Sequence, residues 1–88
     1  MVKLRFRSMT NSQNIVGPQI RRLRNVKGWS QEVFAARLGV AGLDMSRGTL
    51  AKIEAQVRCV SDAELALLAK ALGVKVDDLF PGRGSGRA

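Results

Sequence analysis

Hydrophobic side chains recur every three or four residues along most of this chain, which is the spacing of one face of an α-helix. A first helix is expected to begin at Pro18, because proline suits the first helical position, and to end at Gly28. Ser30 is suited to cap a second helix that runs to Leu38. The apolar positions expected to face inward are Ile20, Leu23, Val26, Val33, Phe34 and Leu38.

The seven residues GVAGLDM join the second helix to a third helical run, from Ser46 to Glu54. Two short helices in succession are typical of a helix-turn-helix, although that motif normally turns in about three or four residues. The long loop leaves an ordinary helical hairpin as the alternative. Leu43 and Met45 are expected to pack beneath the loop.

The fourth helix has the clearest boundaries. Ser61 and Glu64 form a capping box at its start, and Gly73 stands where a helix-ending glycine belongs. A last short turn, VKVDDLF, precedes Pro81. The apolar residues expected to reach the core from this half are Leu65, Leu67, Leu68, Leu72, Leu79 and Phe80. The pattern therefore predicts an all-α fold, a compact bundle of four to five helices.

Basic residues are concentrated in the first two thirds of the chain. Residues 1–58 hold 11 Lys and Arg against three acids, whereas residues 59–82 hold two Lys against four acids. The formal net charge of +8 is therefore one-sided. Such an excess favours a polyanionic partner, with a generally basic soluble protein as the alternative.

Other classes of site are disfavoured by composition. The chain has one cysteine, Cys59, and no histidine, so no disulfide, metal site or cofactor is expected. No nucleophile has a base beside it, so no enzyme is expected. The opening MVKLRFR lacks the apolar centre of a signal peptide, and no apolar run approaches about 18 residues. We expect a soluble cytoplasmic protein with no membrane partner.

The outward face of the third helix has an unusual composition. At about 100° per residue, Leu50, Ile53 and Val57 form an inward stripe. The opposite face carries Arg47, Gly48, Ala51, Lys52 and Ala55. Small residues allow close approach to another surface, and the two flanking cations can donate to guanine or phosphate. This face is therefore predicted to enter a DNA groove; an ordinary exposed face and a protein contact are the alternatives.

Several stretches in order resemble the Cro/repressor-type helix-turn-helix family, also called XRE-like. They are GWSQ at 28–31, RLGV at 37–40, SRGTLAKIE at 46–54, LAKALGV at 68–74 and DDLF at 77–80. The resemblance covers most of residues 18–80. It implies a lambda-repressor-like bundle whose third helix enters the major groove of double-stranded DNA, usually as a homodimer on a palindromic site.

The resemblance also assigns roles to individual residues. The base-facing positions are Arg47, Gly48 and Lys52, with Ala51 on the same helical face. The positions near the DNA backbone are Gln31, Ser46 and Thr49. Arg24 and Glu54 match a pair that the family often uses as a buried salt bridge, which we interpret as orienting the third helix.

Two departures from the family pattern are visible. Residues 41–45 resemble an insertion that enlarges the turn and leaves the base register open. The family usually has a glycine soon after the glutamate, where this chain reads EAQVRC. The third helix is therefore expected to continue to about Val57, which would place Arg58 at a phosphate.

The expected domain organisation is a basic arm at residues 1–14, a helix-turn-helix domain at 15–80 and a flexible tail at 81–88. The alternating MVKLRFR could pair as a strand with a second copy, lie along DNA, or be disordered. The leading prediction is a sequence-specific transcriptional regulator, a small phage or prokaryotic repressor. An antitoxin-like protein that mainly holds a protein partner is the chief alternative, and a non-specific nucleic-acid coat is a third.

Overall fold

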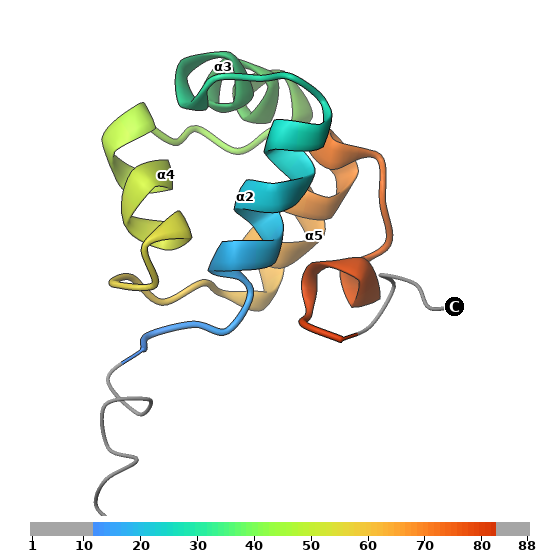
Figure 1. Cartoon of the computed structure of the whole chain (residues 1–88). Coiled ribbons are helices and arrows are strands. Elements are labelled where there is room, and N and C mark those ends of the chain that lie inside the picture. The colour runs from blue at the N-terminus through green and yellow to red at the C-terminus, as the bar shows by residue number, and fades with distance from the viewer. Residues whose placement is uncertain (1–11, 83–88) are drawn as a thin grey trace, which may run out of the picture.

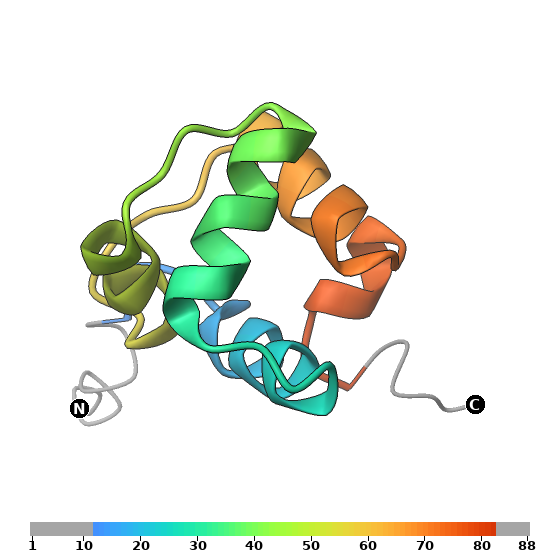
Figure 2. The same ribbon diagram turned by 90° about the horizontal axis from the view of Figure 1, so that it is seen from above.

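The computed structural model describes residues 12–82, and within this range the chain forms four α-helices and one 3-10 turn, with no strand. The elements are α2 (Gly17–Val26), α3 (Gln31–Ala41), α4 (Arg47–Glu54), α5 (Asp62–Leu72) and η1 (Val76–Leu79). In Figure 1, α4 and α5 lie on opposite sides of α2, and α3 crosses above it. Seen from above in Figure 2, α3 runs between α4 and α5. The predicted all-α bundle is confirmed. The MVKLRFR segment, for which a strand, a DNA-contacting arm and disorder are the alternatives, lies outside the described residues, as does most of the predicted tail.

The helix starts follow from local side-chain chemistry. Ser30, Ser46 and Ser61 each accept the backbone N–H three residues further on, at 3.1 to 3.2 Å. Glu64 completes the capping box by accepting the Ser61 N–H at 3.0 Å. Each serine satisfies one backbone donor that the helix itself leaves unpaired, which is typically worth about 1 kcal/mol. The three predicted helix starts are confirmed.

The turn between α3 and α4 differs from the prediction. α3 does not stop at Leu38 but continues to Ala41, so part of the apparent insertion is helix. Gly42 ends it with φ of 109°, a left-handed conformation that favours glycine. The loop is therefore five residues, 42–46, with Met45 buried and Leu43 packed against the core as expected.

The core is formed by side chains from every helix and from η1. Its fully buried members are Phe34, Ile20, Leu38, Leu50, Ile53, Leu68, Leu72 and Leu79. On α2 and α3, two expected inward positions are wrong: Val26 is 71% exposed and Val33 is 43% exposed. Val26 is the last residue of α2, and Val33 lies beside the deeply buried Phe34 on a helix with only a narrow inward face. The buried apolar side chains of α4, Leu50 and Ile53, lie on one face of the helix only.

Candidate nucleic-acid interface

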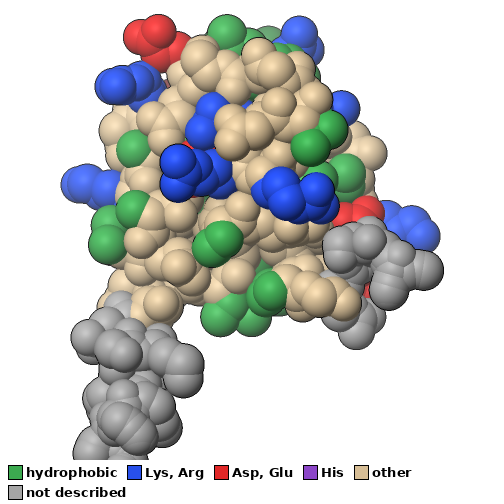
Figure 3. All heavy atoms as spheres, in the orientation of Figure 1, with side chains coloured by type: hydrophobic (Ala, Val, Ile, Leu, Met, Phe, Trp, Pro, Cys, Tyr) green, Lys and Arg blue, Asp and Glu red, His purple; other side chains and the backbone are tan. Residues whose placement is uncertain are grey.

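The outward face of α4 is open to solvent. Leu50 and Ile53 are fully buried beneath it, whereas Arg47, Gly48 and Lys52 are exposed and Ala51 is half-buried. Figure 3 shows Lys and Arg side chains spread over the face that α2 and α4 present, with the few visible acidic side chains toward its edges. The acid within α4, Glu54, is buried. The face therefore offers positive charge around small side chains.

The amino end of α4 carries two linked hydroxyl groups. Ser46 Oγ accepts the Thr49 N–H at 3.1 Å and donates its own proton to Thr49 Oγ1, also at 3.1 Å. Because Thr49 Oγ1 accepts in this pair, its hydroxyl proton stays available for a further acceptor. This end of the helix presents that donor together with the positive end of the helix dipole, which suits a phosphate oxygen.

The carboxyl end of α4 is held from inside by a buried ion pair. Arg24 Nε donates to Glu54 Oε2 at 2.7 Å, and a second guanidinium nitrogen donates to Oε1 at 3.0 Å. Gln31 Nε2 donates to the same Oε1 at 3.1 Å, and Arg24 also donates to the Trp29 carbonyl at 2.7 Å. The salt bridge implied by the family resemblance is therefore present, and it joins α2, α3 and α4.

α4 ends earlier than the sequence led us to expect. Its last residue is Glu54, not Val57, and Val57 is 62% exposed instead of facing the core. Gln56 has φ of 66°, and its N–H donates to the Ile53 carbonyl at 3.0 Å, while the Val57 N–H donates to the Lys52 carbonyl at 2.9 Å. These two bonds form a Schellman motif, so Gln56 occupies the position where glycine is usual. A left-handed conformation costs a residue with a Cβ about 1–2 kcal/mol.

Arg58 is consequently not on an extension of α4, and that placement is wrong. Its guanidinium forms two bonds with Glu64 at the start of α5, at 3.1 and 2.9 Å, and a third with the Cys59 carbonyl at 2.9 Å. The hydrogen bonds from Arg58 and then from the Ser61 backbone lower the pKa of Glu64 below its usual range. In the free protein, Arg58 thus binds Glu64 in the first turn of α5.

The ion pair between Arg58 and Glu64 is expected to make a pH-dependent contribution to the stability of the fold. A carboxylate whose pKa is lowered on folding stabilises the fold above its unfolded pKa, and that contribution is lost as the pH falls through the folded value. We expect Glu64→Gln to lower the free energy of unfolding by about 1 kcal/mol at pH 7, where cap and ion pair are both formed. The difference from the unaltered chain should shrink as the pH falls below about 4, in urea unfolding series at several pH values. A difference that stays constant with pH would contradict this role.

Comparison with known proteins matches residues 20–79 to the family described as helix-turn-helix. The chain belongs to the helix-turn-helix family, in its Cro/repressor-type branch. Members of this family are DNA-binding domains of transcription regulators. No curated protein and no solved structure matches the chain. The matched range runs from α2 to η1 and so includes both helices of the motif, α3 and α4.

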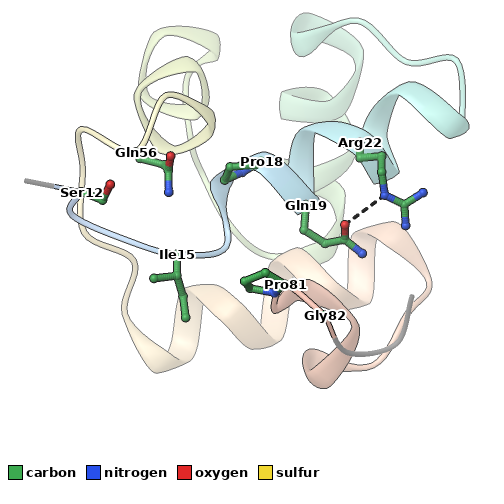
Figure 4. Close-up of a pocket in the computed structure, with 8 residues that line it drawn as sticks. All are labelled: Ser12, Ile15, Pro18, Gln19, Arg22, Gln56, Pro81 and Gly82. Carbon is green, nitrogen blue, oxygen red and sulfur yellow. Dashed lines mark hydrogen bonds between the residues drawn. The ribbon is translucent and has the colours of Figure 1, made fainter. Parts of the chain in front are cut away.

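Within residues 12–82, no three His, Cys, Asp or Glu side chains are grouped to hold a metal ion. No helix in the same range is long and apolar enough to cross a membrane. An open hollow of about 590 Å³ lies between the start of α2 and the residues after η1 (Figure 4). Its lining includes Ile15, Pro18 and Pro81, and none of the predicted DNA-contacting residues.

The sequence reasoning missed two residues beside the site, Asn14 and Gln56. Asn14 was assigned to the basic arm, but its side chain is hydrogen bonded to the carboxyl end of α4. A signal was present, because an asparagine shortly before a helix commonly accepts a backbone N–H of the first turn. Gln56 carried a weaker signal, since it stands near the position where the family usually has glycine.

Proposed function

We propose that this helix-turn-helix protein is a sequence-specific regulator that inserts α4 in the major groove and represses transcription by occupying its operator. The observation that supports this most directly is the outward face of α4, where Gly48 and Ala51 lie between two exposed cations and no acid is present. A face of this composition can approach base edges closely while its cations donate to guanine or phosphate.

Individual contacts are proposed on the same geometry. Arg47, Gly48, Ala51 and Lys52 face the bases, and Gln31, Ser46 and Thr49 hold the DNA backbone. Gln31 fits this position because it lies at the exposed amino end of α3 and uses one amide proton on Glu54. Arg58 remains a predicted backbone contact; since Glu64 neutralises it in the free protein, a phosphate would replace one anion by another.

A homodimer is part of this proposal. One α4 can read only a short half-site, and two copies related by a twofold axis would read an inverted repeat with half-sites about one helical turn apart. The deciding experiment is selection of bound duplexes from a random library at about 150 mM salt, a concentration at which purely electrostatic binding is weakened. Recovery of an inverted repeat is expected. Recovery of no preferred sequence would refute sequence-specific reading and leave a non-specific coat.

Replacement of Gly48 separates stability from DNA contact. A Cβ at Gly48 would meet only Ser46 Oγ at 3.9 Å, an ordinary contact. Gly48→Ala is therefore expected to raise the free energy of unfolding by about 0.4–1 kcal/mol. The added methyl group faces the groove, so affinity for the selected duplex should fall although the fold is more stable. Thermal unfolding and a binding titration check this, and unchanged affinity would place Gly48 outside the interface.

An antitoxin-like role is the second candidate, supported by exposed apolar side chains before α2 and after α4. Ile15, which lines the hollow of Figure 4, is 58% exposed, and Val57 after α4 is 62% exposed. Purification of the chain from its native source distinguishes the two roles. A stoichiometric second protein that remains bound at high salt would favour the antitoxin-like role, whereas a chain that purifies alone and selects an inverted repeat supports the repressor.

A further inference from the structure

The segment before α2 is hydrogen bonded to the carboxyl end of α4, although about forty residues separate them. Asn14 Nδ2 donates to the carbonyl oxygens of Ile53 at 3.1 Å and of Arg58 at 2.8 Å. Its Oδ1 accepts the Gly17 N–H at 2.7 Å. One half-buried amide therefore joins the start of α2, the last turn of α4 and the loop that follows α4.

The backbone next to the Asn14 side chain takes part in the same contact. The Gln13 N–H donates to the Gln56 carbonyl at 2.9 Å, and Gln56 Nε2 donates to the Asn14 carbonyl at 2.9 Å. Figure 4 shows Gln56 pointing toward the segment that leads from Ser12 into α2. A residue with a Cβ keeps a left-handed conformation only where its surroundings fix it. Residues 13 and 14 therefore hold Gln56 in the conformation that ends α4.

The backbones at the start of α2 and at the end of α4 are also in direct contact, with no side chain between them. A Cβ added to Gly17 would collide with the Ile53 carbonyl oxygen and would lie 3.0 Å from that of Glu54. Gly17 is the first residue of α2, so the amino end of α2 is packed directly on the last turn of α4. A movement of one must move the other.

We propose that Asn14 is a positioning residue for DNA binding, which fixes the last turn of α4 and so holds Lys52 in register with the bases. The proposal rests on the proposed function, insertion of α4 in the groove. α4 has only eight residues, so its last turn carries about half of the reading surface. Lys52 directly precedes Ile53, whose carbonyl Asn14 holds. The ion pair at Glu54 fixes a side chain there, whereas Asn14 fixes the backbone.

Asn14→Ala and a matched control test the proposal. The control is Gln19→Ala, because Gln19 Nε2 also donates to a backbone carbonyl, that of Asp78 at 3.1 Å, but at η1 instead of α4. Binding is measured on the selected duplex and on an unrelated duplex, at a temperature where every variant is fully folded. Asn14→Ala should weaken binding to the selected duplex about tenfold, the size of a mismatched base pair, and to the unrelated duplex less than about twofold. An equal loss on both duplexes, or the same loss in Gln19→Ala, would overturn the proposal.

A second change distinguishes positioning from direct contact with DNA. Glycine adopts the left-handed conformation unaided, so Gln56→Gly should let α4 end correctly without support from residues 13 and 14. We expect the double variant Asn14→Ala/Gln56→Gly to regain most of the lost affinity for the selected duplex. A direct contact between Asn14 and DNA would not be regained, so persistence of the full loss would count against positioning.

A measurement without DNA keeps this inference separate from the proposed function. Amide hydrogen exchange at residues 55–57, whose N–H groups close the end of α4, should be about tenfold faster in Asn14→Ala and unchanged in Gln19→Ala. If the unaltered chain selects no sequence, the proposed function fails, and the role of Asn14 in DNA binding fails with it. Unchanged exchange in a chain that does select a sequence would overturn the positioning role alone.

Discussion

Replacement of Glu54 by alanine is expected to destabilise the fold by about 3–5 kcal/mol, because it leaves a buried guanidinium without its counter-ion. The Arg24 side chain is only 10% exposed, and Glu54 accepts two of its hydrogen bonds. Gln31 loses its acceptor at the same time. A domain of this size has a total stability near the lower end of about 5–15 kcal/mol, so the variant should be close to unfolding. Urea unfolding followed by circular dichroism measures the loss.

The control for this prediction removes both charges. Arg24→Met combined with Glu54→Leu replaces the ion pair by apolar side chains, which leaves no isolated charge and is often neutral or stabilising. The double variant is expected to be more stable than Glu54→Ala alone, although the Trp29 carbonyl loses the Arg24 donor. If Glu54→Ala cost less than about 1 kcal/mol, the contact would behave as an exposed pair and could not be what orients α4.

The elements that the sequence predicted correctly depend on residues a few positions apart. Each capping serine accepts the N–H of the residue three positions later, and Ser61 and Glu64 of the capping box have the same spacing. The inward face of α4 likewise follows from the spacing of Leu50 and Ile53. Such features can be predicted from a single sequence because the residues that form them lie close together along the chain.

The end of α4 could not be predicted in this way. The only sign of a left-handed conformation at Gln56 is its place near the family's usual glycine, and the group that accepts its side-chain proton is the Asn14 carbonyl, 42 residues earlier in the chain. Because no glycine closely follows Glu54, the sequence predicts that α4 continues to Val57, and the predicted position of Arg58 depends on that extension. The predicted end of α3 at Leu38 was wrong for a different reason. Gly39 and Gly42 both fit a helix end, and of these two only Gly42 has the left-handed φ.

Replacement of Arg47 by alanine is expected to weaken binding by about 1–3 kcal/mol at one preferred base pair and to relax the preference there. Arg47 is the first residue of α4 and is exposed on the face that we propose to enter the groove. The structure gives its guanidinium no acidic partner among residues 12–82 at salt-bridge distance, so removal should leave the free energy of unfolding almost unchanged. Selection of duplexes by the variant protein, compared position by position with the unaltered chain, measures the change.

The matched control for Arg47 is Arg22→Ala, an exposed arginine on α2 whose Nε, among residues 12–82, donates only to the Gln19 side chain, at 3.0 Å. It removes the same charge from the basic half of the domain without touching α4. Long-range electrostatic attraction should fall in both variants, because both lower the net charge by one. Only Arg47→Ala should change the selected sequence. Uniform weakening on every sequence by both variants would mean that Arg47 contributes charge alone, and Lys52 would then be the base-reading cation of α4.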